Sequence, residues 1–154
     1  MADDLTGGAD DTAGPPTPLE ALQRALAAEH AAVWVLAFLG ARVPATDSSA
    51  LADRLADAFE EHRASRDELT ALVARAGAEP VASATDYELP DPASSPEQLR
   101  GAARTVEERV ARTWAETVGA TSGDDRRRAI AGLRASAVRA LGFGAAPSDL
   151  PGLS

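Results

Sequence analysis

The sequence predicts an all-α protein: an antiparallel four-helix bundle with a long crossover between the second and third helices. Three observations support this. Apolar residues recur at helical spacing in four segments, two of those segments open with a complete capping box, and no segment alternates like a strand. The 154 residues suffice for one domain with a hydrophobic core. We expect the bundle over 17–143, a disordered tail over 1–16 and a flexible tail over 144–154.

The first helix is expected over 18–42. The run Thr17-Pro18-Leu19-Glu20 is a capping box with proline at the first helical position. Behind it, alternating spacings of three and four residues mark one packed face. That face comprises Leu19, Leu22, Leu26, Glu29, Val33, Leu36 and Gly40.

The second helix is expected over 50–76, after the break at Pro44, and it should stop at Gly77. Its packed face includes Leu55, Phe59, His62, Arg66, Leu69 and Val73. The third helix is expected over 96–118, from the capping box at 95–98 to Gly119, and the fourth over 124–142.

The connections predict how the helices are arranged. Short links join the first helix to the second and the third to the fourth, so each pair should be antiparallel neighbours. The segment 78–95 is long and rich in Pro and Ser. A four-helix bundle with one long crossover is the ferritin-like arrangement.

Composition excludes several functional classes. A net charge of −9 disfavours nucleic-acid and anionic-membrane surfaces as partners. The absence of cysteine rules out disulfides, thiolate metal sites and cysteine nucleophiles. The longest nonpolar run, between His30 and Arg42, has about 11 residues where a membrane span needs roughly 20, and the acidic N-terminus has no signal pattern. We therefore expect a cytoplasmic protein.

Charged residues interrupt the packed faces of the first two helices. Glu29 lies 17 residues before Thr46, the centre of the first turn, and His62 lies 16 residues after it. In an antiparallel hairpin they should sit at one depth, so we expect Glu29, His62 and Arg66 to meet in mid-bundle. Buried charges are costly unless they pair. The cluster is either a structural element that fixes helix register or a metal or catalytic site.

Other side chains are additional candidates. His30 lies beside the packed face of the first helix, and Glu107 flanks that of the third, where it either reaches the core or lies on a solvated edge. Trp114 is expected to be a core or interface aromatic. Trp34 and Phe38 should pack on the crossover or on a second copy of the chain, and a homodimer is favoured because an Ala-rich core gains from a partner.

Three segments together resemble the actinobacterial ferritin-like domain of unknown function. They are AEHAAVWVLAFLGARV (28–43), HRASRDELTALVARAGAEPV (62–81) and YELP (87–90), followed by VEE and a tryptophan in the third helix. The resemblance covers about residues 18–142. It implies a ferritin-like bundle and no assigned activity.

Ferritin-like carboxylate proteins hold two irons with a Glu from each of two helices and a Glu-x-x-His from each of the other two. Glu29, His62 and Glu107 match three of these ligands, but Phe59 stands where a glutamate is needed, and 126–142 contains no Asp, Glu or His. We therefore expect no cofactor and a structural or interaction module. The alternative is a metal-binding or oxidoreductase-type protein that uses Glu29, His62 and Glu107 with iron or another divalent metal.

Overall fold

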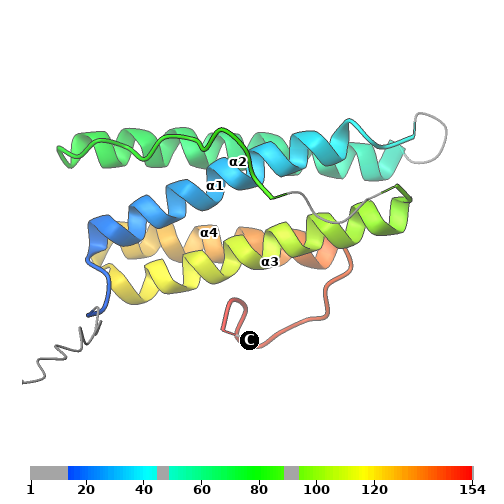
Figure 1. Ribbon diagram of the computed structural model, residues 1–154. Helices are drawn as coiled ribbons and strands as arrows, with labels where there is room; N and C mark the ends of the chain where they lie inside the picture. The colour runs from blue at the N-terminus through cyan, green and yellow to red at the C-terminus, as the bar shows by residue number, and fades with distance from the viewer. Residues whose placement is uncertain (1–13, 45–48, 89–93, 154) are drawn as a thin grey trace, which may run out of the picture.

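The computed structural model describes residues 14–44, 49–88 and 94–153, in which four helices and no strand occur. The helices are α1 (Pro18–Gly40), α2 (Ser49–Arg75), α3 (Pro96–Ala120) and α4 (Gly123–Gly142). Figure 1 shows that α1 and α2 run antiparallel, as do α3 and α4, and that the crossover returns along the length of the bundle. The predicted four-helix bundle with a long second connection is confirmed.

Both predicted capping boxes are present. The side chains of Thr17 and Ser95 accept hydrogen bonds from the backbone N–H of Glu20 and Gln98, whose side chains accept from the two cap residues in return. The α2 helix ends before Gly77, which has a φ of +80° and so a conformation that favours glycine.

The predicted end of the third helix at Gly119 is wrong. The helix continues to Ala120, and the chain turns only at Thr121, whose backbone is extended. Glycine inside a helix costs only about 1 kcal/mol, so it does not terminate a helix by itself. The positive φ that this turn requires falls instead on Gly123, at +56°.

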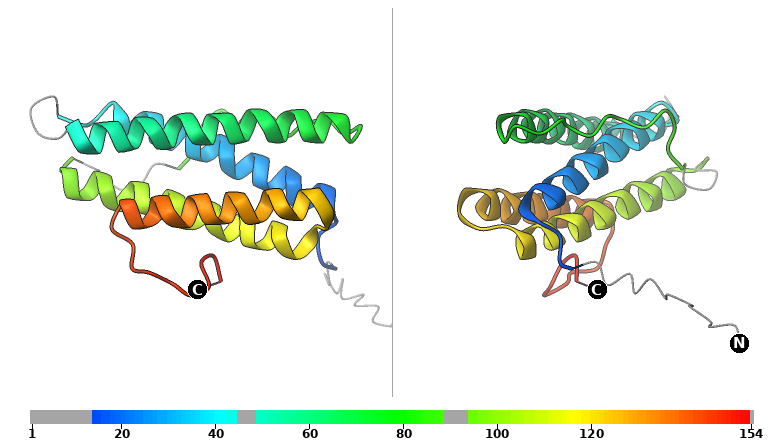
Figure 2. Two further views of the ribbon diagram at one scale, coloured as in Figure 1. Left: turned by 180° about the vertical axis from the view of Figure 1, so that it is seen from behind. Right: turned by 60° about the vertical axis from the view of Figure 1, so that its left-hand side comes forward.

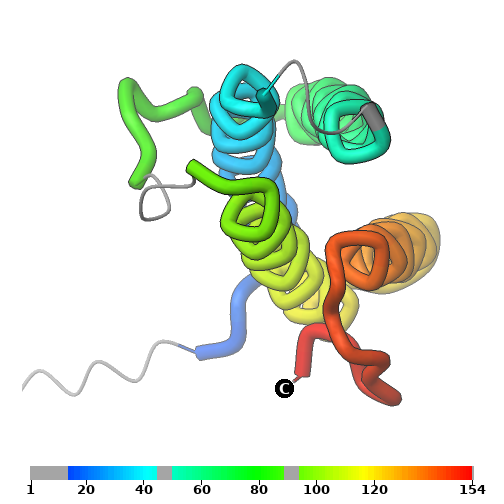
Figure 3. Tube along the Cα trace, turned by 90° about the vertical axis from the view of Figure 1, so that its right-hand side faces the viewer, coloured from blue at the N-terminus to red at the C-terminus, as the bar shows by residue number. Residues whose placement is uncertain are grey.

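The four helices do not pack equally. The α1 helix packs along both α2 and α3, and α3 packs along α4, whereas α2 makes few contacts with α3 or α4. Seen along the bundle, α2 lies above α4 on one side (Figure 3), and the two run side by side in the left view of Figure 2. The α2–α4 side is therefore the loosely packed side of the bundle.

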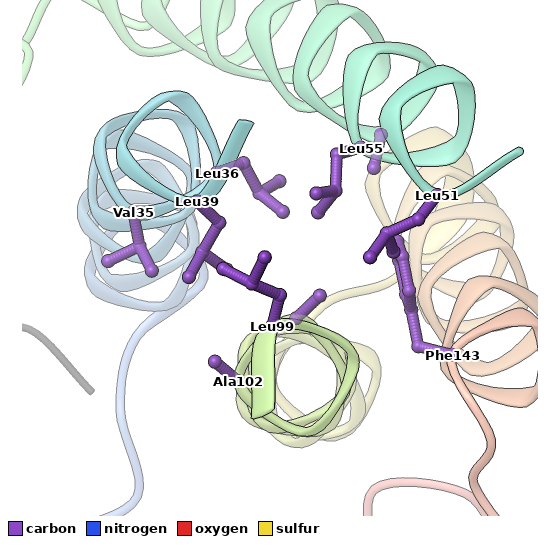
Figure 4. Close-up of a cluster of buried hydrophobic side chains, with 10 residues drawn as sticks. Val35, Leu36, Leu39, Leu51, Leu55, Leu99, Ala102 and Phe143 are labelled. Atoms are coloured by element: carbon purple, nitrogen blue, oxygen red, sulfur yellow. The ribbon is translucent and has the colours of Figure 1, made fainter. Parts of the chain in front are cut away.

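Two apolar clusters form the core. One, drawn in Figure 4, gathers large side chains from α1, α2, α3 and the segment after α4: Leu36, Leu39, Leu51, Leu55, Leu99 and Phe143. The other contains Leu22, Leu26, Leu69, Val73, Val110 and Trp114. Along α2 and α3, His62 and Glu107 fall between the positions of the two clusters. The middle of the bundle is therefore polar.

Trp34 on α1 packs on the crossover and stacks with Phe38. The rings of Trp34 and Phe38 are stacked with centroids 6.2 Å apart, and the ring of Tyr87 lies 5.8 Å from that of Trp34. The guanidinium of Arg42 lies 4.0 Å from the centre of the Phe38 ring. Of the two environments expected for this pair, the structure shows the crossover for Trp34, through Tyr87, whereas Phe38 packs between Trp34 and Arg42.

Two further features concern the ends of the bundle. The segment after α4 returns along α3, where Gly152 approaches the Ala111 carbonyl and Ala115; its flexibility remains a prediction. Most of the predicted N-terminal tail, 1–13, lies outside the described residues.

By length and composition alone, α1 is apolar enough to cross a membrane, as core helices of soluble proteins also are.

Candidate functional site

A buried imidazole lies between two buried carboxylates at the centre of the bundle. The Nδ1 atom of His62 on α2 is 2.5 Å from Oε2 of Glu29 on α1, and its Nε2 atom is 3.1 Å from Oε1 of Glu107 on α3. None of the three residues is more than 1% exposed. The ring therefore connects three helices through charged hydrogen bonds.

The second oxygen of Glu29 is also satisfied. Its Oε1 atom accepts a hydrogen bond of 2.9 Å from the Ser65 hydroxyl and one of 3.1 Å from the indole Nε1 of Trp114. With His62 on the other oxygen, the carboxylate has three donors. This number of partners compensates for the water that the carboxylate loses on burial.

The α4 helix contributes a cation, Arg139. Its Nε atom donates to Oε1 of Glu107 at 3.0 Å, its Nη1 to Glu61 at 2.5 Å and its Nη2 to the Ser136 hydroxyl at 3.1 Å. The side chain is 18% exposed. We call Glu29, His62, Glu107 and Arg139 the central cluster; with His62 protonated, its two anions and two cations cancel.

The charge of His62 follows from its surroundings. Burial opposes the imidazolium, but hydrogen bonds from the ring to Glu107 and Glu29, together with the charges of these carboxylates, outweigh burial and raise the pKa of His62 to about 9. Arg139 Nη2 lies 3.4 Å from Nε2 and acts against this charge, but its own charge is balanced by Glu107 and Glu61. At neutral pH both ring nitrogens are therefore donors.

The structure brings together two of the three residues predicted to meet in mid-bundle and excludes the third. Glu29 and His62 pair as expected. The prediction that Arg66 joins them is wrong, because its guanidinium turns outward and pairs with Asp67 at 2.7 Å. Ser65 occupies the inward position on that turn of α2, and Arg139 supplies the compensating cation.

The two additional candidates, Glu107 and His30, lie in different environments. Glu107 reaches the core, so the solvated-edge alternative is wrong for this residue. Its Oε2 atom is buried and has no hydrogen-bond partner among the described residues. His30 lies outside the central cluster, and its Nε2 atom contacts the backbone carbonyl of Val81 in the crossover at 3.1 Å.

The central cluster does not fit a di-iron centre. Such a centre needs carboxylates that converge on the metals, whereas the two carboxylates here bind opposite nitrogens of one ring. The Arg139 guanidinium is hydrogen-bonded to Glu107, where a metal would have to bind. Within 14–44, 49–88 and 94–153, no three His, Cys, Asp or Glu side chains are placed to hold a metal ion.

A groove leads from the cluster to the surface between α2 and α4. It encloses about 290 Å³, and Glu29 and Trp114 lie among its lining residues. Two ion pairs cross it, Arg128 to Glu68 and Arg139 to Glu61, each at 2.5 Å. We call this feature the α2–α4 groove.

Gly132 allows α4 to approach the indole in this groove. A Cβ atom at Gly132 would lie 2.5 Å from Cε2 of Trp114, which is closer than nonbonded carbon atoms come. The sequence alone does not point to Ser65, Gly132 or Arg139. No pattern in it marks these positions as inward-facing, because that depends on how α2 and α4 are rotated about their axes.

The fold and the site define an all-helical bundle with a buried, charge-compensated polar cluster. The chain belongs to the family DUF4439, a domain of unknown function, whose model matches residues 21–154. It is similar to the crystal structure of rv2844, a conserved hypothetical protein from Mycobacterium tuberculosis, with a TM-score of 0.75 and 31% identity. The similarity covers 82% of this chain and 93% of that one. None of the curated proteins matches the chain.

Proposed function

We propose that the protein is an actinobacterial ferritin-like bundle that works as a structural or interaction module without a di-iron centre. The observation that carries this proposal is the bonding of His62, whose two nitrogens each hold a carboxylate while Arg139 neutralises the second one. The helix order with one long crossover supports the ferritin-like assignment. In this reading the central cluster replaces metal chemistry with internal charge pairing.

Iron loading tests this proposal. The purified protein is incubated with ferrous iron under air and followed by optical and Mössbauer spectroscopy, with metal content measured by mass spectrometry. We expect no bridged di-ferric signal. Such a signal at about one centre per chain, absent from a His62→Ala variant, would overturn the proposal.

A second candidate function is binding of a single divalent metal by Glu29, His62 and Glu107. These side chains would first have to move, because the two carboxylates bind opposite nitrogens of the ring. One observation favours this candidate. The Oε2 atom of Glu107 is buried without a partner among the described residues and keeps lone pairs available. Metal binding would require His62 to lose its proton. This candidate therefore predicts that Mn²⁺ or Zn²⁺ affinity, measured by calorimetry, rises steeply between neutral pH and about pH 9 and disappears in Glu107→Gln.

The proposal extends to location and partners. A net charge of −9 supports a cytoplasmic protein that binds neither nucleic acid nor anionic membranes. Self-association as a homodimer is supported by exposed apolar side chains on α4, namely Ile130, Val138 and Leu141. Sedimentation that shows only monomer at micromolar concentration would reject the dimer.

A further inference from the structure

The walls of the α2–α4 groove carry opposite charges. On the α2 side, Glu61 and Glu68 lie two turns apart, and on the α4 side Arg128 and Arg139 lie three turns apart. We propose that this groove binds a small zwitterion of the α-amino-acid class, with its ammonium toward α2 and its carboxylate toward α4. The proposal deepens the proposed function, since it names what an interaction module would bind.

The groove has space for such a ligand between its two ion pairs. There α4 presents only small residues, Ala131 and Ala135, on either side of Gly132, which the Trp114 indole covers. The volume of about 290 Å³ lies at the lower end of the range for small-molecule sites. The ligand is therefore a small molecule and not a peptide segment or a nucleotide.

The depth of the groove supplies polar contacts. The Ser65 hydroxyl donates to Glu29 and so keeps its own lone pairs available for a ligand donor. Leu69 and the indole of Trp114 line the same space and offer an apolar surface to an aliphatic side chain. A ligand with a charged end and an apolar branch satisfies both kinds of surface.

The two ion pairs across the groove can be exchanged at low cost. The side chains of Glu68 and Glu61 are more than half exposed, and ion pairs in such positions contribute little to stability. Arg128 also has a donor in reserve, because its Nε atom is buried and has no partner among the described residues. The carboxylate of a ligand could accept hydrogen bonds from Nε and from one Nη of this guanidinium at once. The present contact with Glu68 uses Nη1 alone.

Charge balance selects the ligand class. A zwitterion can replace one crossing ion pair with two, one to each wall, and leaves no groove charge unpaired. A simple amine or a simple carboxylate can pair with one wall only, so it forms one charged contact where the zwitterion forms two. Specificity for the zwitterion over either analogue is therefore the signature of this site.

Calorimetric titration of the full chain tests the proposal. L-leucine is compared with isoamylamine, which lacks the carboxylate, and with 4-methylpentanoate, which lacks the ammonium. We expect L-leucine to bind with a Kd of millimolar order or tighter and each analogue to bind at least about tenfold more weakly. Failure of all twenty amino acids to bind below about 10 mM, or equal binding of the analogues, would overturn the proposal.

Variants separate the groove from the rest of the surface. Arg128→Gln is expected to weaken L-leucine binding by about tenfold or more, and Ala135→Leu, which fills the groove, should abolish it. Arg112→Gln, an exposed position on α3 outside this groove, should leave binding unchanged. If Ala135→Leu does not fold, Arg128→Gln decides alone, and unchanged binding there would refute the proposal. Iron loading of the same sample tests the absence of a di-iron centre separately.

Discussion

The Nδ1 atom of His62 lies 2.5 Å from Oε2 of Glu29, although the two residues are 33 positions apart and both are buried. The bond crosses the interface between α1 and α2. A slip of either helix by one turn would leave a buried charge without its partner, which is strongly unfavourable. The pair therefore holds the first hairpin in one register, and Glu107 extends the same constraint to α3.

The protonation of His62 predicts how stability depends on pH. Its pKa is raised from 6.5 to about 9 in the folded protein, so folding favours the charged ring. This contribution is fully present below about pH 6.5 and is lost as the pH rises to about 9. The difference corresponds to roughly 3 kcal/mol. Denaturant unfolding between pH 6 and pH 10 measures it.

The matched reference for this measurement is His62→Gln, which cannot titrate. We expect the difference in unfolding free energy between the native chain and this variant to shrink across the same pH interval. A difference that stays constant from pH 6.5 to pH 9 would mean that His62 is neutral in the folded protein and that the carboxylates do not hold its proton.

Removal of the cation from α4 is predicted to destabilise the fold. In Arg139→Met, Glu107 keeps only His62, and the central cluster acquires a net negative charge. Breaking a buried ion pair on one side costs about 3–5 kcal/mol, and the partial exposure of Arg139, 18%, places the expected loss at the lower end. The measurement is the urea midpoint at pH 7.

Two other arginines serve as controls for this substitution. Arg66→Met breaks a pair with Asp67 at the surface, and Arg134→Met alters an exposed position on α4. Each should change stability by less than about 1 kcal/mol. If Arg66→Met lowered the stability as much as Arg139→Met, the Arg66 side chain would not point outward in solution.

The sequence was sufficient to predict the pairing of Glu29 with His62, because both lie on regular apolar faces and at nearly equal distances along the chain from the middle of the link between α1 and α2. It was not sufficient to predict Arg139. An arginine near the end of a helix looks the same in sequence whether its side chain extends into solvent or into the core. Its direction depends on how α4 rotates against α3, and the spacing of apolar residues defines that rotation only coarsely. The misplacement of Arg66 has the same origin, since one residue position turns a side chain by 100°.

The helix boundaries likewise differ in how well the sequence predicts them. Capping boxes gave the starts of α1 and α3 because they are local hydrogen-bonded structures. The end of α3 was wrong because Gly119 can remain helical, and the turn depends on Gly123 instead. For Glu107 the sequence does not decide between the core and a solvated edge. The position of α3 depends on a long crossover whose geometry the sequence does not define.

Complete replacement of the cluster is predicted to be tolerated better than its disruption. Glu29→Gln alone removes one charge and leaves His62⁺ with a weaker partner, for an expected loss of about 3 kcal/mol. In the combined variant Glu29→Leu, His62→Leu, Glu107→Leu and Arg139→Met, no buried charge remains unpaired. Its stability should lie within about 1–2 kcal/mol of the native chain. Equilibrium unfolding decides, and a combined variant less stable than each single one would show that the cluster contributes net stability.

The close contact between Gly132 and Trp114 is predicted to be sensitive to one added methyl group. In Gly132→Ala the added Cβ would lie 2.5 Å from the indole, so the ring must shift and its hydrogen bond to Glu29 must lengthen. Overpacking of this kind costs about 1–3 kcal/mol. In a Trp34→Phe background, the emission of Trp114 reports the change directly, and a shift to longer wavelength is expected.

The control is Gly101→Ala on α3, where a Cβ meets nothing within 4 Å. There the lower flexibility of alanine should stabilise the helix by about 0.5–1 kcal/mol. If both variants stabilise equally, α4 has room to move away from Trp114, and the close approach is not required for the fold.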